Sequence, residues 1–445
     1  MRPRLEIGSN AGKNPDYTRF VLADPGVQIS IKRPVWKGIV EPESLSATLL
    51  LPRGYRLPET FKAGAFLTLY DSDSTSPRDR PFIGRIDSAV IRPSTRRRGR
   101  YEVDVSGVSI VSELYQNPLT RPILPINSFD STYAKTAQKA MDAITKALPN
   151  GWKLEPIGSD FYTRINSLDD RTFYAKLLNH SAGVWEPDRP AIDVIESFCM
   201  QWCLVPTFTP FDRTVEIRAV EKLYTSELAI HAYRCDLDAE WSIRPEDTVN
   251  ALSLTSIDTG AEPLKPDPVT SPRTGTSSRN PVVYHNQAST SSIGHRARSA
   301  RMLIDSQVIA GEEGGRVRQT LGNRLGPRFT SPHPPELSPE ALTFDFENSS
   351  IPAIGDTLHR FMDSSVNLIG ARPPAAPITS LTAQVSEAHI TVRGHHPQQH
   401  KVGAAVTMTL RLCQASITQR PASAGRWDTL TGRWTDQPTP WETIA

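Results

Sequence analysis

Residues 81–115 read PFIGRIDSAVIRPSTRRRGRYEVDVSGVSIVSELY, and the first part of the chain is organised around this stretch. Apolar and charged residues alternate over residues 82–91, which predicts a strand that is covered on one side and partly covered on the other. A second alternation begins at Tyr101, so the basic run between the two predicts a hairpin with a long, charged tip. Apolar residues then recur at helical spacing and predict a short helix within residues 108–115.

Length and composition limit the class of protein. The chain has 445 residues, more than one hydrophobic core usually supports, so two to four domains are expected. Its 50 basic and 48 acidic side chains leave a formal charge of +2, which gives no global field that would recruit nucleic acid or an anionic membrane. No run approaches the ~18 apolar residues of a membrane span, so no membrane insertion is expected. Four irregularly spaced cysteines argue against a disulfide framework and suit a reducing cytosol.

Short alternating runs precede the hairpin. Residues 27–31, 45–51 and 65–69 predict three strands separated by turns that contain proline and glycine. Together with the hairpin they give about five strands at the regular spacing of a small barrel or sandwich. We therefore expect a first β-barrel-like domain over residues 1–120.

The spacing of the apolar residues changes after this domain. Residues 133–148 carry them on one helical face and predict an amphipathic helix. A second helix is expected to begin at Pro190, followed by a hairpin over residues 204–220. Helices beside a small sheet predict an inserted α+β domain at residues 121–245.

Strands return in the last large region, for which we expect a second β-barrel-like domain over residues 246–420. Within it, residues 258–292 lose periodicity and predict a long loop, and leucines four apart predict a helix at residues 311–325. The apolar alternation within residues 381–392 changes parity at Ser386, as a bulge or a tight turn requires.

Residues 421–445 form a tail of different character. Trp427, Trp434 and Trp441 are seven residues apart, and Gly-Arg-Trp occurs twice. Nearby prolines oppose a helical heptad, and three tryptophans in a polar tail are not expected to form a core of their own. This pattern predicts a docking tail whose tryptophans fill pockets on a neighbouring subunit; a terminus that folds back on its own domain is the alternative. The expected fold class is thus α+β and mainly β: two small β-barrel-like domains, an inserted α+β region and a short tryptophan-repeat tail.

The usual catalytic motifs are absent from the sequence. It lacks the nucleophile elbow G-x-S-x-G, the zinc-protease motif H-E-x-x-H and the phosphate-binding loop G-x-x-x-x-G-K-[ST]. Asp169 with Asp170, or Asp71 with Asp73, would be the paired carboxylates of a glycosidase. Neighbouring carboxylates in strands or turns point apart, so we interpret them as turn residues that cap local amides. No catalytic residue is assigned, and the chain is not expected to be an enzyme.

Histidines and cysteines likewise predict no metal site. His395, His396 and His400 lie in HHPQQH, a polar loop between two strands with no cysteine or carboxylate at ligand spacing, which favours a solvated hairpin tip. Cys199 and Cys203 are four residues apart on the amphipathic helix, which favours core packing over metal binding. We therefore expect no metal and no cofactor.

Short motifs follow one another in a characteristic order along most of the chain. They are GRI at residues 84–86, LY at 114–115, TVNALSLTS at 248–256, SIG at 292–294 and IPAIGDTL at 351–358. This order, with an inserted α+β unit, resembles phage tail-tip hub proteins: the minor tail proteins of phages of actinobacteria and, more remotely, the baseplate hub and type VI secretion spike family. The resemblance implies two similar β-barrels per chain, a homotrimer that presents six barrels as a pseudo-sixfold ring, and a central channel.

The resemblance implies a structural role. We expect a hub that closes the tail tube and connects the distal tail protein and the tape measure protein to tip or receptor-binding proteins, for host attachment and genome delivery. The protein would be made in the host cytoplasm and reside at the virion tail tip, with DNA passing through without specific binding. The alternatives are a cell-wall hydrolase at the virion tip and a carbohydrate-binding adhesin of the β-sandwich type.

The basic hairpin tip is the one concentrated charge in the sequence. A solvated tip is the simplest interpretation; the functional ones are contact with an acidic neighbour or with the phosphates of passing DNA. A channel that transports DNA should avoid tight binding, so we favour a subunit contact. The candidate partner-binding residues are Trp427, Trp434, Trp441, Arg96, Arg97, Arg98 and Arg100.

Overall fold

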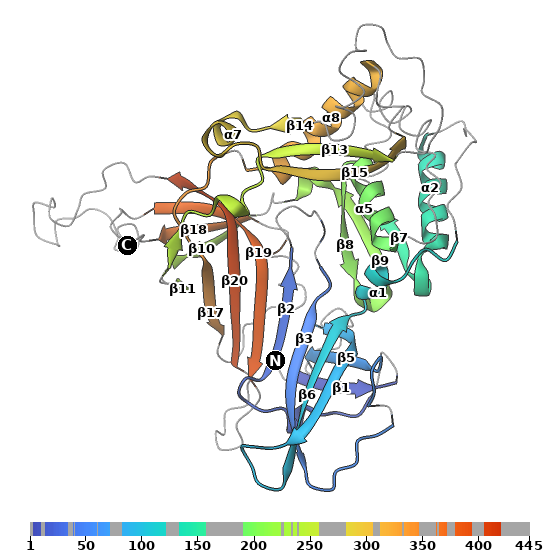
Figure 1. The fold of residues 1–445 in the computed structure, drawn as a ribbon, viewed down its shortest axis with the longest axis vertical. Coiled ribbons are helices and arrows are strands. Elements are labelled where there is room, and N and C mark those ends of the chain that lie inside the picture. The colour runs from blue at the N-terminus through green and yellow to red at the C-terminus, as the bar shows by residue number, and fades with distance from the viewer. Residues whose placement is uncertain are drawn as a thin grey trace, which may run out of the picture.

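The computed structural model describes most of the chain (Figure 1). The described residues are 3–9, 14–33, 39, 41–59, 61–71, 82–121, 133–156, 190–223, 227–232, 235–237, 240–257, 282–305, 312–331, 333–346, 362, 365–371, 379–393 and 405–419. A large sheet fills the lower and middle parts of the picture, and the helices lie along its top and right side.

One 12-stranded sheet runs through both β regions of the chain. Its main path is β1 (Pro3–Gly8), β4 (Phe66–Asp71), β5 (Phe82–Pro93), β6 (Arg100–Ser109), β3 (Ser44–Pro52), β2 (Val27–Lys32), β19 (Thr379–Arg393), β20 (Ala405–Gln419), β17 (Ala341–Phe346) and β11 (Asp236–Leu237). Beside β19 lie β18 (Ser365–Ala371) and then β10 (Glu227–His231). The predicted class, α+β and mainly β, is confirmed.

Alternating burial explains why these segments are strands. In β2, Val27, Ile29 and Ile31 are buried, while the side chains between them point outward. Because successive side chains of a strand point to opposite faces, this alternation places one face on the core. The strands predicted at residues 27–31, 45–51 and 65–69 and the hairpin of residues 82–105 are all present.

The first β module, β1 to β6 with the segment 14–22, closes on itself. In the sheet, β1 and β3 do not pair with each other. The backbone N–H of Tyr17 donates to the carbonyl of Leu5 in β1 (2.8 Å), and the backbone N–H of Leu22 donates to the carbonyl of Thr48 in β3 (2.9 Å). The segment 14–22, with the 3-10 helix η1 (Thr18–Phe20), therefore bridges β1 to β3. Buried side chains from all these strands form one cluster, as expected of a small barrel.

The second β module comprises β10, β18, β19, β20, β17 and β11. Its two outer strands, β10 and β11, are separated by only a few residues in sequence. The two modules are joined by the ladder between β2 and β19, from Lys32 opposite Glu387 to Val27 opposite Val392, and they share one hydrophobic cluster.

The parity change predicted near Ser386 is a bulge. Residues 379–393 form one continuous strand, β19, whose register against β20 shifts between Val385 and Glu387. Val385 and Ala388 are both buried, so the extra residue returns the apolar positions to the core face.

The inserted region packs helices on a small sheet. The helices are α1 (Ser112–Gln116), α2 (Tyr133–Ala147) and α5 (Ala191–Gln201), and the sheet has the order β7 (Lys153–Pro156), β9 (Thr214–Ala219), β8 (Leu204–Thr209). The helices predicted at residues 133–148 and from Pro190 are confirmed, and Arg213 makes the predicted hairpin turn with φ 49°. The helix predicted within residues 108–115 is shorter, because β6 continues through Ser109 in its pairing with β5.

A second small sheet lies against this region. It has the order β14 (Val282–His285), β13 (Ala251–Ile257), β15 (Ala297–Asp305) and is accompanied by α7 (Gln287–Ile293) and α8 (Glu312–Phe329). Residues 282–293, expected in the long loop, thus include a strand and a helix. Leu252, Leu321 and Leu325 belong to the same core as the inserted helices, whereas β10 and β11 belong to the second β module. Strand pairing therefore does not follow the boundary expected at residue 245.

Helix α8 continues past its expected end at residue 325. Pro327 lies inside it, near its last turn, and the backbone N–H of Thr330 donates to the carbonyl of Gly326 (2.9 Å). Gly326 lets the helix approach β14, because a Cβ there would lie 2.2 Å from Cγ of Tyr284.

The remaining elements are short. β12 (Trp241–Ser242) pairs with β16 (Ser338–Pro339), and 3-10 helices occur at η3 (Pro149–Gly151), η4 (Pro210–Asp212), η5 (Val220–Lys222) and η7 (Pro245–Asp247). Within the described residues, no helix combines the length and apolar character needed to cross a membrane.

Candidate functional site

The seven candidate partner-binding residues fall in two groups. Arg96, Arg97, Arg98 and Arg100 lie together at the turn between β5 and β6. The tryptophans, at positions 427, 434 and 441, lie outside the described residues, as do His395, His396, His400, Asp73, Asp169 and Asp170. Of the two groups, the structure thus describes the arginines of the hairpin.

The hairpin tip holds its arginines outward. The backbone N–H of Ser94 donates to the carbonyl of Arg100 (2.9 Å), and the Ser94 hydroxyl accepts the N–H groups of Arg96 (3.2 Å) and Arg97 (3.0 Å). Gly99 has φ +80°, a conformation that glycine adopts without cost. The hydrogen bonds of the turn thus engage the backbone of the tip, and the arginine side chains are left outside it. The side chains of Arg96, Arg97 and Arg98 are exposed, and that of Arg100 is half-buried.

Below the tip, a charged cluster fixes the two strands. Nη1 of Arg92 lies 2.8 Å from Oδ2 of Asp104, and Nε of Arg92 lies 3.4 Å from Oε2 of Glu102. The hydroxyl of Ser94 donates to Oε1 of Glu102 (2.8 Å). Because Glu102 is buried, these partners satisfy a carboxylate that would otherwise be costly.

The distal half of β5, residues 87–93, is an open edge. β4 pairs with β5 only from Phe82 to Arg85, whereas β6 follows β5 to Pro93. In the described part of the chain, no strand lies on the other side of residues 87–93. Val90 and Ile91 are 54% and 56% exposed, and an exposed apolar edge is a template for pairing with another chain.

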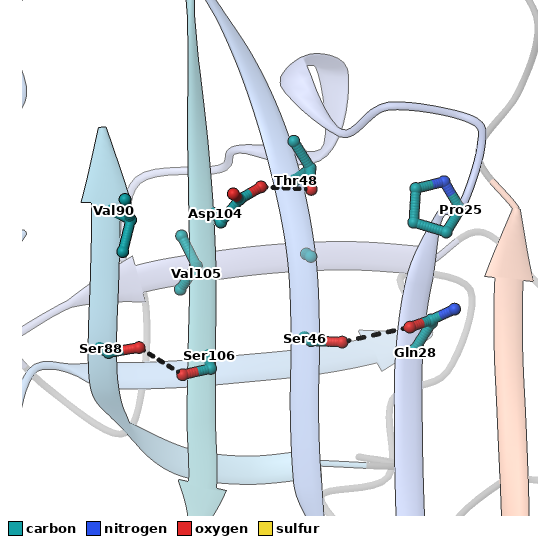
Figure 2. A pocket seen from close by; sticks show the side chains of 10 residues that line it. Pro25, Gln28, Ser46, Thr48, Ser88, Val90, Asp104, Val105 and Ser106 are labelled. Carbon is teal, nitrogen blue, oxygen red and sulfur yellow. Dashed lines mark hydrogen bonds between the residues drawn. The ribbon is translucent and has the colours of Figure 1, made fainter. Parts of the chain in front are cut away.

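The face that β5, β6, β3 and β2 turn away from the core is rich in hydroxyl groups, and we call it the hydroxyl face. Figure 2 shows these strands side by side, with hydrogen bonds between Ser88 and Ser106 (2.8 Å), from Thr48 to Asp104 (2.7 Å) and from Ser46 to Gln28 (3.4 Å). A shallow pocket of about 250 Å³ lies among them. Its polar groups already bond one another, so it offers few free groups to a small ligand.

The hydroxyl face continues across the ladder between β2 and β19. Nζ of Lys32 and Nε2 of His389 each lie 2.9 Å from Oε1 of Glu387. Farther along, Arg411 pairs with Glu340 (2.9 Å) and the hydroxyls of Thr343 and Thr409 bond each other (3.1 Å). The charges of this face are therefore largely paired.

The pKa of Glu387 lies below its ordinary value. Partial burial acts to raise it, but the hydrogen bond from Lys32 and the positive charges of His389, Lys32 and Arg411 outweigh that effect and lower the pKa. The carboxylate is therefore ionised in the folded protein at neutral pH and links the two β modules by charge.

Glu113 joins the first β module to the inserted region and was missed in the sequence. It is 7% exposed, and its carboxylate accepts hydrogen bonds from Arg85 of β5 (3.2 and 3.3 Å), Arg213 of the β8–β9 turn (3.4 Å) and the indole N–H of Trp152 (3.3 Å). Since these partners are far apart in sequence, no local spacing could have identified the cluster.

The cysteines of the described residues are buried, except for Cys235, which is partly buried. Cys199 and Cys203 are buried and unbonded to each other, and burial raises the pKa of the Cys199 thiol. Both belong to the hydrophobic core, as predicted, but only Cys199 lies on α5, because the helix ends at Gln201 and Cys203 follows it with φ 52°. Among the residues with described positions, no group of three or more histidine, cysteine, aspartate or glutamate side chains is arranged to hold a metal ion.

Comparison with known proteins gives similarity to solved structures. Neither a family model nor a curated protein matches the chain. A prophage MuSo2 43 kDa tail protein from Shewanella oneidensis is 12% identical, with a TM-score of 0.45 over 92% of this chain and 98% of that one. A tail protein from Neisseria meningitidis MC58 is 11% identical, with a TM-score of 0.46 over 93% and 97% of the two chains. An E. coli type VI secretion component, c3393, is 8% identical, with a TM-score of 0.40 over 92% and 76%. The first two of these structures are described as tail proteins and the third as a type VI secretion component.

Proposed function

We propose that this chain is a structural hub of a phage tail tip, in which copies of the chain meet edge to edge around a channel. The observation that carries the proposal is the edge of residues 87–93, which no strand of the described residues covers, at one end of an eight-strand path, β5-β6-β3-β2-β19-β20-β17-β11. At the other end, β11 covers only Leu342 and Thr343 of β17, which leaves the rest of that edge open within the described residues.

Two different open edges favour a ring. A contact between the β5 edge of one copy and the β17–β11 edge of the next is heterologous, and such contacts close into a ring when the rotation per copy allows. Each chain brings two β modules, so a trimer would present six. The expected number of three copies comes from the motif resemblance. The two open edges are the surfaces through which the copies would contact each other.

The hydroxyl face suits the wall of the channel. Its positive side chains are already engaged: Arg92 with Asp104, Lys32 with Glu387 and Arg411 with Glu340. Tight, salt-dependent binding of DNA depends on cations that are free to neutralise phosphates. A wall of paired charges and small hydroxyls would let DNA pass without specific binding.

The hub would connect the parts of the tail tip. Its partners would be its own copies, the distal tail protein, the tape measure protein and the tip or receptor-binding proteins, and its role would be host attachment and genome delivery from the virion tail tip. Trp427, Trp434 and Trp441 would anchor one such neighbour, and the arginine tip another. The mechanism is assembly through large interfaces rather than catalysis.

Mass photometry of the purified protein tests the proposal. The expected species has three times the mass of the chain, and Ile91→Lys should shift the population to monomer, because a charge on an open edge opposes strand addition. Phe211→Lys is the matched control, since Phe211 is 39% exposed in the turn between β8 and β9, outside both β modules, and it should leave the trimer intact. A wild-type protein that stays monomeric at micromolar concentration would contradict the proposal.

A further inference from the structure

Arginines from three separate segments meet at one end of the first β module, where β3 ends and β6 begins, at the bottom of Figure 1. We call this set the arginine end; its members are Arg19, Arg53, Arg56, Arg96, Arg97, Arg98 and Arg100. Pro52 pairs with Arg100 in the β3–β6 ladder, which brings Arg53 to the hairpin tip. Nη1 of Arg96 donates to the carbonyl of Asp24 (2.9 Å), which brings the tip to the segment after η1.

Within the described residues, the arginine end is not neutralised by acidic side chains. All its members except Arg100 are exposed, and in the described residues none of their guanidinium groups forms an ion pair. Of the acidic residues nearby, Asp16 is engaged by Arg4 (3.2 Å), while Asp24 and Glu59 are exposed. Since the whole chain carries a formal charge of only +2, this positive charge is a local concentration.

Apolar and aromatic side chains lie among these charges. The rings of Phe20 and Tyr55 meet edge to face with centroids 5.1 Å apart, and the guanidinium of Arg19 lies 4.6 Å from the centre of the Phe20 ring. Tyr101, beside Arg100, is largely exposed, as is Ile91. Tyrosine and arginine are the residues that contribute most at protein interfaces, where aromatic anchors are buried and charges are paired at the rim.

We infer that the arginine end is a docking surface for an acidic protein segment that carries apolar side chains between its carboxylates. Arginine forks pair with carboxylates in two-point contacts, and a partner with aromatic or aliphatic residues covers Tyr55 and Tyr101. A nucleic-acid backbone would satisfy the charges but leave the rings of Tyr55 and Tyr101 uncovered, which is why we favour a protein. The inference names a partner chemistry for the hub and in that respect rests on the proposed function.

Fluorescence anisotropy with the full-length chain tests the inference. The probe is a labelled peptide of Glu-Glu-Phe repeats; the comparison probes are the same peptide with glutamine for each glutamate and a duplex DNA of equal net charge. At physiological salt the glutamate peptide should bind and both comparison probes should bind at least about 10-fold more weakly, because charge and apolar contact are both required.

Three variants locate the binding. Affinity for the glutamate peptide should fall about 10-fold in each of two double variants, Arg53→Ser/Arg56→Ser and Arg97→Ser/Arg98→Ser. The control, Lys146→Ser/Arg296→Ser, removes two exposed cations elsewhere and should change this affinity less than about twofold. Equal affinity in all variants would overturn the inference, and tighter binding of the DNA through the same arginines would overturn it in favour of a nucleic-acid site. Mass photometry of the same samples separates the two proposals: a trimer that ignores the peptide contradicts only the docking surface, and a monomer that binds it contradicts only the ring.

Discussion

Removal of the Glu113 carboxylate is the perturbation that tests the internal architecture most sharply. In Glu113→Ala, the indole N–H of Trp152, which is 1% exposed, loses its hydrogen-bond partner. An unsatisfied buried donor costs about 1–3 kcal/mol. Arg85 and Arg213 also lose their carboxylate, but both are partly exposed, so solvent reduces each contribution to about 0.5–1 kcal/mol. We expect the free energy of unfolding to fall by about 2–5 kcal/mol.

Urea unfolding followed by tryptophan fluorescence measures this loss, and hydrogen exchange localises it. Faster exchange should appear in α1 and in the β8–β9 turn, because Glu113 and Arg213 hold these two elements together. Glu155→Ala is the matched control: it removes an exposed carboxylate of the same region and should leave the urea midpoint unchanged. If Glu113→Ala were as stable as Glu155→Ala, the assignment of Glu113 as the joint between the first β module and the inserted region would be wrong.

The other predictions concern packing, charge and pH. Gly326→Ala should cost about 1–3 kcal/mol, measured by urea unfolding, because the new methyl group would meet the ring of Tyr284; an unchanged midpoint would show that the ring moves aside freely. Replacement of the three arginines at residues 96–98 by serine should leave the melting temperature nearly unchanged, since these side chains are exposed. A large drop in the melting temperature would show that they are part of the core. The pKa of Glu387 is lower in the folded than in the unfolded chain, so its stabilisation is present above the unfolded value and is lost as pH falls through the folded value. Glu387→Gln should therefore reduce the fall of the melting temperature between neutral pH and pH ~3, and Lys32→Met should do the same. If the melting temperature fell by the same amount in variant and wild type, this charge link would be wrong.

Local patterns in the sequence were sufficient for the secondary structure of several segments. The alternation in residues 27–31 and 45–51, the helical spacing of residues 133–148 and the parity change at Ser386 each depend on neighbours in the chain, and each predicted the observed element. Residues 282–293 were the exception, because short Ser- and Thr-rich segments carry too little periodicity to distinguish a strand or a helix from a loop.

Long-range partners could not be predicted from those patterns. Apolar spacing shows which residues are buried, but the surface that covers them is set by the whole fold. This is why β10 and β11 lie in the second β module, why β13 and α8 lie against the inserted helices, and why the segment 14–22 closes the first module. At the candidate site, the arginine run at residues 96–98 was visible in the sequence, whereas the approach of Arg53 depends on the register of β3 against β6.

Negative-stain electron microscopy of the purified chain tests the central claim most directly, because the claim is that copies of this protein meet around an axis. The account predicts round particles with a central hole and three repeated units, formed without any other component. Isolated particles the size of one chain, or pairs with no central hole, would contradict it.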